Sequence, residues 1–524
     1  MPDLGTRHGR YAGVILPTFS LRSAADWGVG EIPDLAGMAA WLAMAGQRSL
    51  HTLPLLERAA HERSPYSALS AFAIDPIHVG LDLVEDFVAV GGRAALTGAE
   101  RDAIARLRSE RTIDYDGVRV LKQRALELGF ACFARNELAS QTARARRFQA
   151  FQAAEASWLD DYTLYRALSG THRETSWESW PEALRRRDGA ACADARARLA
   201  SRLAYYAYVQ WVAHEQLAEA RRVAARCGVE IVGDLPFTVA VDSVDVWARQ
   251  DDFDVAVSIG APPDAFDAAG QDWALPAFRW EVVRGNDFAW LRDRLAHVGR
   301  WLDGARLDHV VGYFRTFVRP PEGAPHFTPA DPEEQRALGA AALDVVQAAA
   351  GASRVFAEDL GDVPDFVREA MAARGLPGYR VLRWEADGPV YRDPRAFPAC
   401  SIATTGTHDT STLAAWWSEE LDDDARRRLT DVPVFAPLRD AGPDFTPAVH
   451  EGLVDGLYAA GSDTALLLVQ DVFGRRERIN TPATISDDNW SHRLPLAIEQ
   501  LAGVQGRERA AWLRAIARRH GRAA

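Results

Sequence analysis

The sequence predicts an α/β fold, a (β/α)8 barrel with helical insertions and long active-site loops. The first observation is that three carboxylates, Asp308, Glu358 and Asp409, each follow a short apolar run. The second is their spacing of 50 and 51 residues, about the length of one strand-helix unit with its loops. The third is the length of 524 residues, since barrels with elaborated loops run from about 200 to over 400 residues. Because polar residues that end barrel strands converge at one face, we expect the three carboxylates to meet there.

The opening of the chain has the pattern of a strand, a helix and a second strand. Short apolar runs at 13–17 and 50–55 flank the segment 35–45, whose apolar residues have helical spacing. Ser64-Pro65-Tyr66 follows in a loop. Loops at the strand ends carry function in this architecture, so this tripeptide is a candidate for the site.

Residues 83–228 change character and predict a mostly helical insertion. The segment is rich in Ala, Arg and Glu, and apolar residues such as Leu203, Tyr206 and Val209 recur at helical spacing. Its aromatic side chains could stack on sugars, but packing in a core at helical spacing is the favoured interpretation. These aromatic residues are Trp158, Tyr162, Tyr165, Trp177, Trp180 and Trp211.

The barrel pattern resumes after the insertion. An apolar run over 229–234 ends at Asp234, and a further strand-like run lies at 465–469. Between them, 253–280 is rich in Gly, Pro and aromatic residues and lacks periodicity, which predicts a long active-site loop. We expect residues 1–524 to form a single catalytic barrel unit that contains both the insertion and this loop.

Composition and charge are those of an ordinary globular protein, with 48% hydrophobic and 25% charged residues. A net charge of −13 disfavours binding to nucleic acid or to anionic membranes. The N-terminus lacks a long apolar segment with a cleavage site, and no stretch reaches about 18 uninterrupted apolar residues, so we expect a cytoplasmic location. The four cysteines are scattered and suggest neither a zinc site nor a disulfide framework.

Three acids at strand ends suit chemistry at a glycosidic bond. Any one of them could instead cap a helix or lie in a loop, but three in sequence, two of them flanked by His, favour a catalytic role. Cleavage of a sugar acetal with retention needs a nucleophilic carboxylate and a second carboxyl, kept protonated, that donates to the leaving oxygen. A third acid can hold sugar hydroxyls as the ring distorts toward an oxocarbenium ion.

Other chemistries fit the sequence less well. It lacks Gly-x-x-x-x-Gly-Lys, a convincing Gly-x-Gly-x-x-Gly after a strand, and Gly-x-Ser-x-Gly. His309 and the pair His408-Asp409 could belong to a metal site, but the helical His-x-x-x-His spacing is absent. We therefore expect neither a metal nor another cofactor.

Several segments match the signature segments of one enzyme family. The strongest are the three that carry the acids: Arg306-Leu307-Asp308-His309, Ala357-Glu358-Asp359-Leu360-Gly361 and Thr407-His408-Asp409. Further matches are Ser64-Pro65-Tyr66, Gly233-Asp234-Leu235-Pro236, Gly260-Ala261-Pro262-Pro263-Asp264-Ala265-Phe266, Gly270-Gln271-Asp272-Trp273 and Asn489-Trp490. On these motifs the chain resembles the 4-alpha-glucanotransferases, also called amylomaltases or disproportionating enzymes, which form glycoside hydrolase family 77. The resemblance runs from about Gly13 to about Pro495.

The resemblance implies a role for each acid, without a catalytic metal. Asp308 would be the nucleophile, Glu358 the general acid/base and Asp409 the transition-state stabiliser. Polar neighbours and glucan-contacting or supporting residues would be Arg306, His309, His408, Ser64, Tyr66, Asp234, Gln271, Trp273 and Asn480. The implied activity is transfer of α-1,4-glucan segments from a donor maltodextrin to the 4-hydroxyl of an acceptor glucan or glucose, by a retaining double displacement. Malto-oligosaccharides and glucans are thus the expected partners; no motif bears on the oligomeric state.

Two alternatives remain open beside glucan transfer. The first is an α-1,4-glucan hydrolase of the same clan, in which water is the principal acceptor. The second is a non-catalytic glucan-binding protein that keeps the fold without turnover. The presence of all three carboxylates argues against the second alternative.

The sequence departs from the family pattern at a few positions. The family commonly has Trp-Gly-Asn-Pro where this chain has Trp273-Ala274-Leu275-Pro276. It commonly has Asn followed by an acid where Thr410-Ser411-Thr412 stands, and Asn-Pro where Asp75-Pro76 stands. Since none of these is a proposed catalytic carboxylate, they bear on acceptor and chain-length preference rather than on the reaction class.

Overall fold

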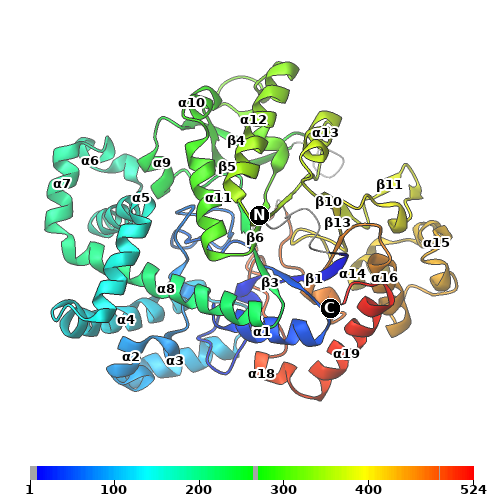
Figure 1. Cartoon of the computed structure of the whole chain (residues 1–524), viewed down its shortest axis with the longest axis horizontal. Helices are drawn as coiled ribbons and strands as arrows, with labels where there is room; N and C mark the ends of the chain where they lie inside the picture. The colour runs from blue at the N-terminus through cyan, green and yellow to red at the C-terminus, as the bar shows by residue number, and fades with distance from the viewer. Residues whose placement is uncertain (1–8, 264–269, 483, 485, 524) are drawn as a thin grey trace, which may run out of the picture.

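Eight parallel strands form a closed barrel at the centre of the molecule, as the computed structural model shows (Figure 1). The structure describes residues 9–523 except 264–269, 483 and 485. The part of the predicted active-site loop at 264–269, with its Asp264-Ala265-Phe266 motif, lies outside the described residues. The barrel strands are β1 (Tyr11–Ile15), β2 (Ser49–His51), β3 (Glu230–Leu235), β6 (Gly304–Leu307), β9 (Arg354–Ala357), β10 (Gly378–Val381), β13 (Ser401–Thr404) and β14 (Thr464–Leu468).

The strands follow one another around the barrel in chain order, and β14 closes it against β1. In the registered pairs Asp234 lies opposite Arg306, and Leu307 lies opposite Ala357. The residues that follow, Asp308 and Glu358, therefore leave neighbouring strands at the same end of the barrel. Inside the barrel a separate apolar cluster fills the lumen, formed by Val232, Phe356, Tyr379, Ile402 and Leu466.

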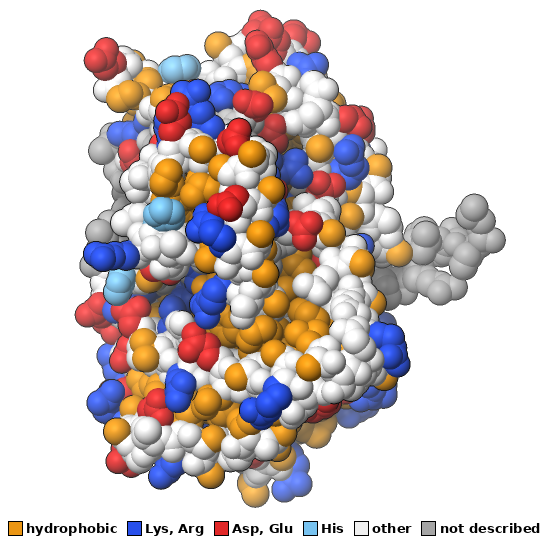
Figure 2. Space-filling view, turned by 90° about the vertical axis from the view of Figure 1, so that its left-hand side faces the viewer, with side chains coloured by type: hydrophobic (Ala, Val, Ile, Leu, Met, Phe, Trp, Pro, Cys, Tyr) orange, Lys and Arg blue, Asp and Glu red, His pale blue; other side chains and the backbone are white. Residues whose placement is uncertain are grey.

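The predicted helical segment between β2 and β3 forms helices on one side of the barrel (Figure 1). They are α2 (Glu85–Ala89), α3 (Gly98–Ser109), α4 (Tyr115–Phe133), α5 (Ala143–Thr171), α6 (Glu182–Arg185), α7 (Gly189–Arg198) and α8 (Ala200–Arg226). The six aromatic residues weighed as sugar-stacking faces are all buried. They pack in the core, which confirms the favoured interpretation. Figure 2 shows this face, with positive and negative side chains interspersed.

The expectation of a loop without regular structure over 253–280 is wrong. The segment contains β4 (Phe253–Ala261) and β5 (Gln271–Phe278), which pair antiparallel. With β7 (Thr316–Arg319) and β8 (His326–Thr328) they form a four-stranded sheet separate from the barrel. The periodicity is lost in the sequence because the β4–β5 register shifts twice and because Gly260 approaches the Gln271 carbonyl too closely for any side chain.

The remaining helices cover the barrel from outside. They are α1 (Asp34–Met44), α9 (Val244–Ala248), α10 (Trp280–Gly285), α11 (Ala289–Trp301), α12 (Pro332–Ala350), α13 (Asp365–Ala373), α14 (Leu413–Ala415), α15 (Asp423–Asp431), α16 (Pro447–Tyr458), α17 (Val469–Val472), α18 (Ile498–Leu501) and α19 (Val504–Arg519). A two-stranded ribbon, β11 (Ala386–Asp387) and β12 (Val390–Tyr391), follows β10. Among the described helices, none combines the length and the apolar character that crossing a membrane requires.

Arg522 ties the segment after α19 to the barrel at the end opposite the carboxylates. Its side chain is fully buried, and its guanidinium donates hydrogen bonds of 2.6–3.2 Å to five backbone carbonyl oxygens. These belong to Tyr458, Tyr11, Asp463, Ala460 and Ser462. Since Tyr11 begins β1 and Ser462 and Asp463 precede β14, this single side chain holds both strands of the closing pair.

Candidate active site

Arg306 lies at the centre of the predicted site. From β6 its Nη1 donates to both carboxylate oxygens of Asp234 on β3, at 2.9 Å each. The same nitrogen lies 2.7 Å from Oδ1 of Asp308, and Nη2 lies 3.9 Å from Oε2 of Glu358. The guanidinium therefore bridges two of the three predicted catalytic acids and neutralises part of their negative charge.

Glu358 is held in an environment that favours its protonated form. Burial raises the pKa of Glu358 to about 7; Arg306 opposes this shift and the Asp308 charge adds to it. The carboxyl accepts hydrogen bonds from the backbone N–H groups of His309, at 2.9 Å, and Leu360, at 3.0 Å. These contacts fix the orientation of the carboxyl, and a substantial fraction of Glu358 is protonated near neutral pH.

Asp409 has the opposite protonation preference. Although burial disfavours its charge, His408 and Asn480 lower the pKa of Asp409 below its ordinary value. His408 Nε2 lies 3.1 Å from Oδ2, and the Asn480 side-chain amide donates to Oδ1 at 2.6 Å. Burial opposes the charge of His408, yet the adjacent Asp409 raises the pKa of His408 overall. The third acid is thus an anchored carboxylate, with two-fifths of its side chain exposed.

Tyr66 joins the Asp234 and His408 sides of the site. Its hydroxyl donates to Oδ2 of Asp234 at 2.8 Å and lies 3.3 Å from Nδ1 of His408. Its ring stacks on the His408 ring, with centroids 4.9 Å apart. Burial raises the pKa of Tyr66 well above its ordinary value, so the hydroxyl remains a donor. Ser64 accepts a hydrogen bond from the Tyr66 N–H at 3.3 Å and supports this turn; among the described residues it makes no hydrogen bond to the acids.

Gln271 and Trp273 approach the site from β5. The Trp273 indole N–H donates to Oε1 of Gln271 at 3.0 Å, and the indole packs edge-on against the His309 ring at 4.8 Å. His309 itself has a left-handed φ of 49°, which aims its backbone N–H at Glu358. Burial lowers the pKa of His309 to about 4, so the ring beside Trp273 is neutral.

The family departures fall on structural positions. Ala274 has a φ of 54°, a conformation that favours glycine. Leu275 lies opposite Ile259 in the β4–β5 pair and packs against the core. The Thr410 hydroxyl donates to the Thr407 carbonyl at 3.0 Å. Asp75 is fully buried, and its carboxylate lies 3.2 Å from Arg58 Nε.

Three further residues near the site had no role assigned from the sequence, although Asp359 belongs to the segment that carries Glu358. Asp359 accepts a hydrogen bond from the Tyr379 N–H at 2.6 Å and pairs with Arg380 at 3.1 Å, which ties the segment after β9 to β10. Tyr379 belongs to the lumen cluster. Trp384, which follows β10 at the catalytic end, keeps 44% of its surface exposed. The signal for Tyr379 was the short alternating run over 378–381, and that for Asp359 was its position next to Glu358.

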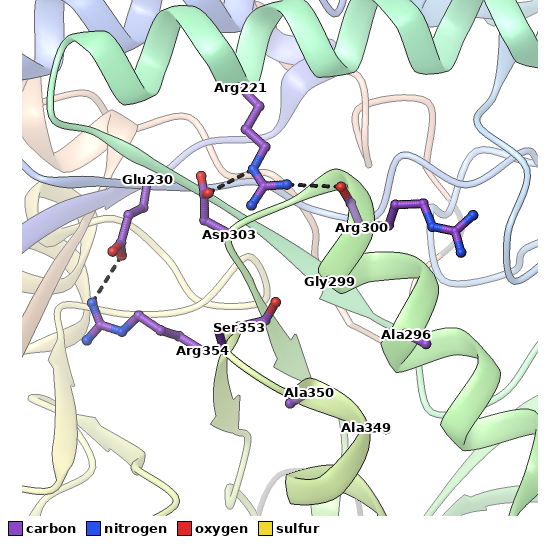
Figure 3. Close-up of a pocket in the computed structure, with 11 residues that line it drawn as sticks. Arg221, Glu230, Ala296, Gly299, Arg300, Asp303, Ala349, Ala350, Ser353 and Arg354 are labelled. Carbon is purple, nitrogen blue, oxygen red and sulfur yellow. Dashed lines mark hydrogen bonds and ion pairs between the residues drawn. The ribbon is translucent and has the colours of Figure 1, made fainter. Parts of the chain in front are cut away.

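A cavity of about 540 Å³ opens at the opposite end of β3, β6 and β9 (Figure 3). Arg221 donates to Asp303 at 2.8 Å and to the Arg300 carbonyl at 3.0 Å. Arg354 donates to Glu230 at 3.0 Å. The cavity contains none of the predicted acids. The Arg354–Glu230 pair links the starts of β9 and β3, and Arg221 ties α8 to the residue before β6. We therefore assign this cavity a structural role, since catalysis in this architecture occurs at the other end of the barrel.

The fold and the site together define an enzyme that acts on glycosidic bonds. Asp308 and Glu358 follow adjacent barrel strands and both lie beside Arg306. Glu358 is partly protonated near neutral pH. A third, ionised carboxylate lies across the same end of the barrel. Retaining chemistry at an acetal requires such a division between an acid and an anion.

Comparison with solved structures confirms the (β/α)8 barrel. An amylomaltase from Streptococcus agalactiae, solved in complex with acarbose, superposes with a TM-score of 0.82 at 24% identity, over 98% of this chain and 100% of that one. The amylomaltase from Corynebacterium glutamicum gives a TM-score of 0.79 at 23% identity, over 96% of this chain and 75% of that one.

The sequence comparisons define the family. The profile described as 4-alpha-glucanotransferase matches residues 16–498. The 4-alpha-glucanotransferase of Thermus thermophilus is 31% identical, over 97% of this chain and 98% of the relative. That of Chlamydia pneumoniae is 27% identical, over 94% and 92%. The chain belongs to the 4-alpha-glucanotransferases, glycoside hydrolase family 77. It is accordingly a glycosyltransferase that acts on α-1,4-glucans.

Proposed function

We propose that the three acids divide the transfer reaction among them. Protonated Glu358 donates its proton to the interglycosidic oxygen while the Asp308 carboxylate attacks the anomeric carbon. The C–O bond to the leaving glucan breaks, and a covalent glucosyl ester on Asp308 forms. Ionised Glu358 then removes the proton from the 4-hydroxyl of an acceptor glucan, whose oxygen displaces Asp308. The new α-1,4 bond has retained configuration, and both residues return to their starting states.

The raised pKa of Glu358 is the observation that carries this assignment. A general acid must hold its proton at the working pH, and a pKa of about 7 satisfies this condition. Arg306 stabilises the negative charge of Asp308, which favours the ionised nucleophile. When the ester forms, that charge disappears and Arg306 remains close to Glu358, which is then ionised. The shared guanidinium thus supports both halves of the reaction.

Asp409 would act on the substrate rather than on the bond itself. Its anchored carboxylate can accept hydrogen bonds from sugar hydroxyls as the ring distorts, and His408 and Asn480 keep it ionised and oriented. We assign Tyr66, Asp234, Gln271, Trp273 and the remaining polar neighbours to glucan binding or to support of the acids. Preference for a sugar acceptor over water would follow from Trp273 and the β4–β5 pair, which cover the His309 side of the site.

The physiological setting is part of the proposal. Relatives of this family carry the name 4-alpha-glucanotransferase, and the interspersed charges of Figure 2 give no extended positive surface for an anionic polymer on that face. We place the activity in maltodextrin or glycogen metabolism in the cytoplasm. Residues 1–524 would form one catalytic unit, with malto-oligosaccharides and glucans as its substrates.

Incubation with maltotriose tests the transfer directly. We expect glucose together with oligosaccharides longer than maltotriose, while the total number of reducing ends stays nearly constant, because each cleavage is matched by a new bond. Chromatography by chain length and a reducing-end assay measure the two quantities.

Two other outcomes would contradict transfer. A steady rise in reducing ends without longer products would identify a hydrolase, and unchanged maltotriose in the presence of binding would identify a non-catalytic protein. Asp308→Asn and Glu358→Gln serve as controls, since each removes chemistry but little volume. Both should lose several orders of magnitude in turnover and keep glucan binding.

A further inference from the structure

A second cavity of about 620 Å³ lies on the outside of the barrel, away from the acids. It is formed by the start of α16, the first half of α19 and the residues that follow α17 (Figure 1 shows α16 beside α19). Phe473 and Gly474, which line it, follow the catalytic end of β14. The same segment continues to Asn480, which binds Asp409. Since six residues span at most about 20 Å, the cavity opens near the same rim as the active site.

Three partly exposed aromatic rings form much of the cavity wall. Phe445, Phe473 and Trp512 are each half-buried and line the space. The buried His450 ring bridges two of them, with centroids 5.2 Å from Phe445 and 4.8 Å from Trp512. Sugars present flat C–H faces, and pockets that bind small molecules combine such aromatic surfaces with a few placed polar groups.

His450 supplies a buried acceptor to this cavity. Its Nε2 donates to the Asp471 carbonyl oxygen at 2.6 Å, because a carbonyl can only accept. Burial lowers the pKa of His450 to about 4, so the ring is neutral and Nδ1 is an acceptor without a partner among the described residues. A Cβ at Gly474 would lie 3.3 Å from Nδ1, so the glycine keeps the approach to this nitrogen open.

Arg509 supplies donors. Its guanidinium lies 4.7 Å from the centroid of the Trp512 ring, and within the described part of the chain it has no ion-pair partner. Glu508 adds an exposed carboxylate, while Glu451 is engaged by Arg519 at 3.4 Å. With His450 neutral, the acidic groups at this cavity balance or exceed the single arginine. An anion would be disfavoured, whereas a neutral ligand rich in hydroxyls could use every one of these groups.

We propose that this cavity is a second glucan-binding site, which holds glucosyl units of a long chain while another part of that chain occupies the catalytic acids. The choice of glucan among neutral sugars rests on the proposed function. The pyranose faces would lie against Trp512 and Phe473, and sugar hydroxyls would bond Arg509 and His450 Nδ1. Because the site lies near the catalytic rim, it would favour long substrates over short ones.

The test compares Trp512→Ala and Arg509→Ala with Arg507→Ala, an exposed residue of the same helix that does not line the cavity. Affinity electrophoresis in gels containing glycogen, and KM values for glycogen and maltotriose as donors, are measured for each. We expect both cavity variants to bind glycogen about threefold to tenfold more weakly, with a matching rise in KM for glycogen. Their kcat with maltotriose should stay within about twofold of wild type.

Each outcome has a distinct meaning. Wild-type retardation by glycogen in both cavity variants would overturn the second site, and so would binding of inorganic phosphate that these variants abolish. If Trp512→Ala fails to fold, as judged by circular dichroism, Arg509→Ala decides the matter, because its side chain is only partly buried. A wild-type enzyme that leaves maltotriose unchanged would instead contradict the proposed function and not the cavity, whose binding the gels measure separately.

Discussion

Arg306 and Glu358 show how single residues set the protonation states of the site. The guanidinium touches three carboxylates, so their mutual repulsion is reduced without removing any of them from the site. Glu358 nevertheless keeps a raised pKa, because burial outweighs the attraction of an arginine 3.9 Å away. The protonated carboxyl is therefore the more stable form in the folded protein. When the pH rises and Glu358 ionises, the native state loses stability.

This balance predicts a pH-dependent effect of Glu358→Gln. The pKa of Glu358 rises from 4.5 to about 7 on folding, so its favourable contribution is complete below pH 4.5 and is lost as the pH rises through 7. Glutamine does not ionise. The free energy of unfolding of the variant relative to wild type should therefore increase by about 1–3 kcal/mol between pH 5 and pH 8.

Urea unfolding followed by tryptophan fluorescence at the two pH values measures this change. A relative stability that is equal at pH 5 and pH 8 would show that the pKa is not raised. In the wild-type enzyme the same proton should limit catalysis, so kcat/KM for donor cleavage should fall above about pH 7.

Ala274 gives a second prediction at this scale. Its φ of 54° places a Cβ in the left-handed region, which costs about 1–2 kcal/mol for a residue other than glycine. Ala274→Gly should remove this strain and raise stability by about 0.5–1 kcal/mol, once the added freedom of the unfolded chain is subtracted. Ala277→Gly in the same strand is the matched control, because Ala277 is buried and has an ordinary φ; it should lose stability. A loss of stability in both variants would show that Ala274 is unstrained.

At the scale of elements, the antiparallel sheet of β4, β5, β7 and β8 positions Gln271 and Trp273. A Cβ at Gly260 would lie 1.8 Å from the Gln271 carbonyl oxygen, so Gly260→Ala must push β5 away from β4. We expect transfer from maltotriose to fall at least tenfold in this variant while the barrel remains folded. Gly285→Ala, in α10, meets no atom within 4 Å and should keep wild-type activity. Full activity of Gly260→Ala would mean that this sheet does not position the site.

The strands that lead to the acids could be predicted, and others could not, for physical reasons. β9 and β13 each contain consecutive buried apolar residues, Val355–Ala357 and Ile402–Ala403, which predict a strand. β6 is interrupted by Arg306, and the segment that continues to Asp308-His309 marks its position in the sequence. β10 has the same Gly and Arg alternation as β6, but no segment that matches the family follows it to mark it as a strand. In β4 and β5 the register shifts and a proline interrupt the two-residue alternation. The backbone conformation of His309 and the pKa of Glu358 arise from tertiary contacts, which the sequence does not display.

At the scale of the whole molecule, Arg522 connects the segment after α19 to the closing strands of the barrel. Arg522→Ala would remove five hydrogen bonds to backbone carbonyl oxygens, although those of Tyr458, Ala460 and Asp463 keep a second donor; the loss should destabilise the protein by about 2–4 kcal/mol. A clear drop in Tm by differential scanning fluorimetry is the expected result. Arg518→Ala, an exposed position of α19, should change Tm little. Equal Tm values for the two variants would show that the carbonyl groups find other partners.

The pairing of β1 with β14 also determines when the barrel can close during synthesis of the chain. About 450 residues separate the two strands, and a ribosome adds roughly 5–20 residues per second. An interval of roughly 20 to 90 seconds therefore passes between the synthesis of β1 and that of its partner. Throughout that interval the nascent chain carries an unpaired strand edge, which is the feature that invites association with other chains. We therefore expect the yield of folded enzyme to depend on the supply of chaperones that cover this edge until translation reaches β14.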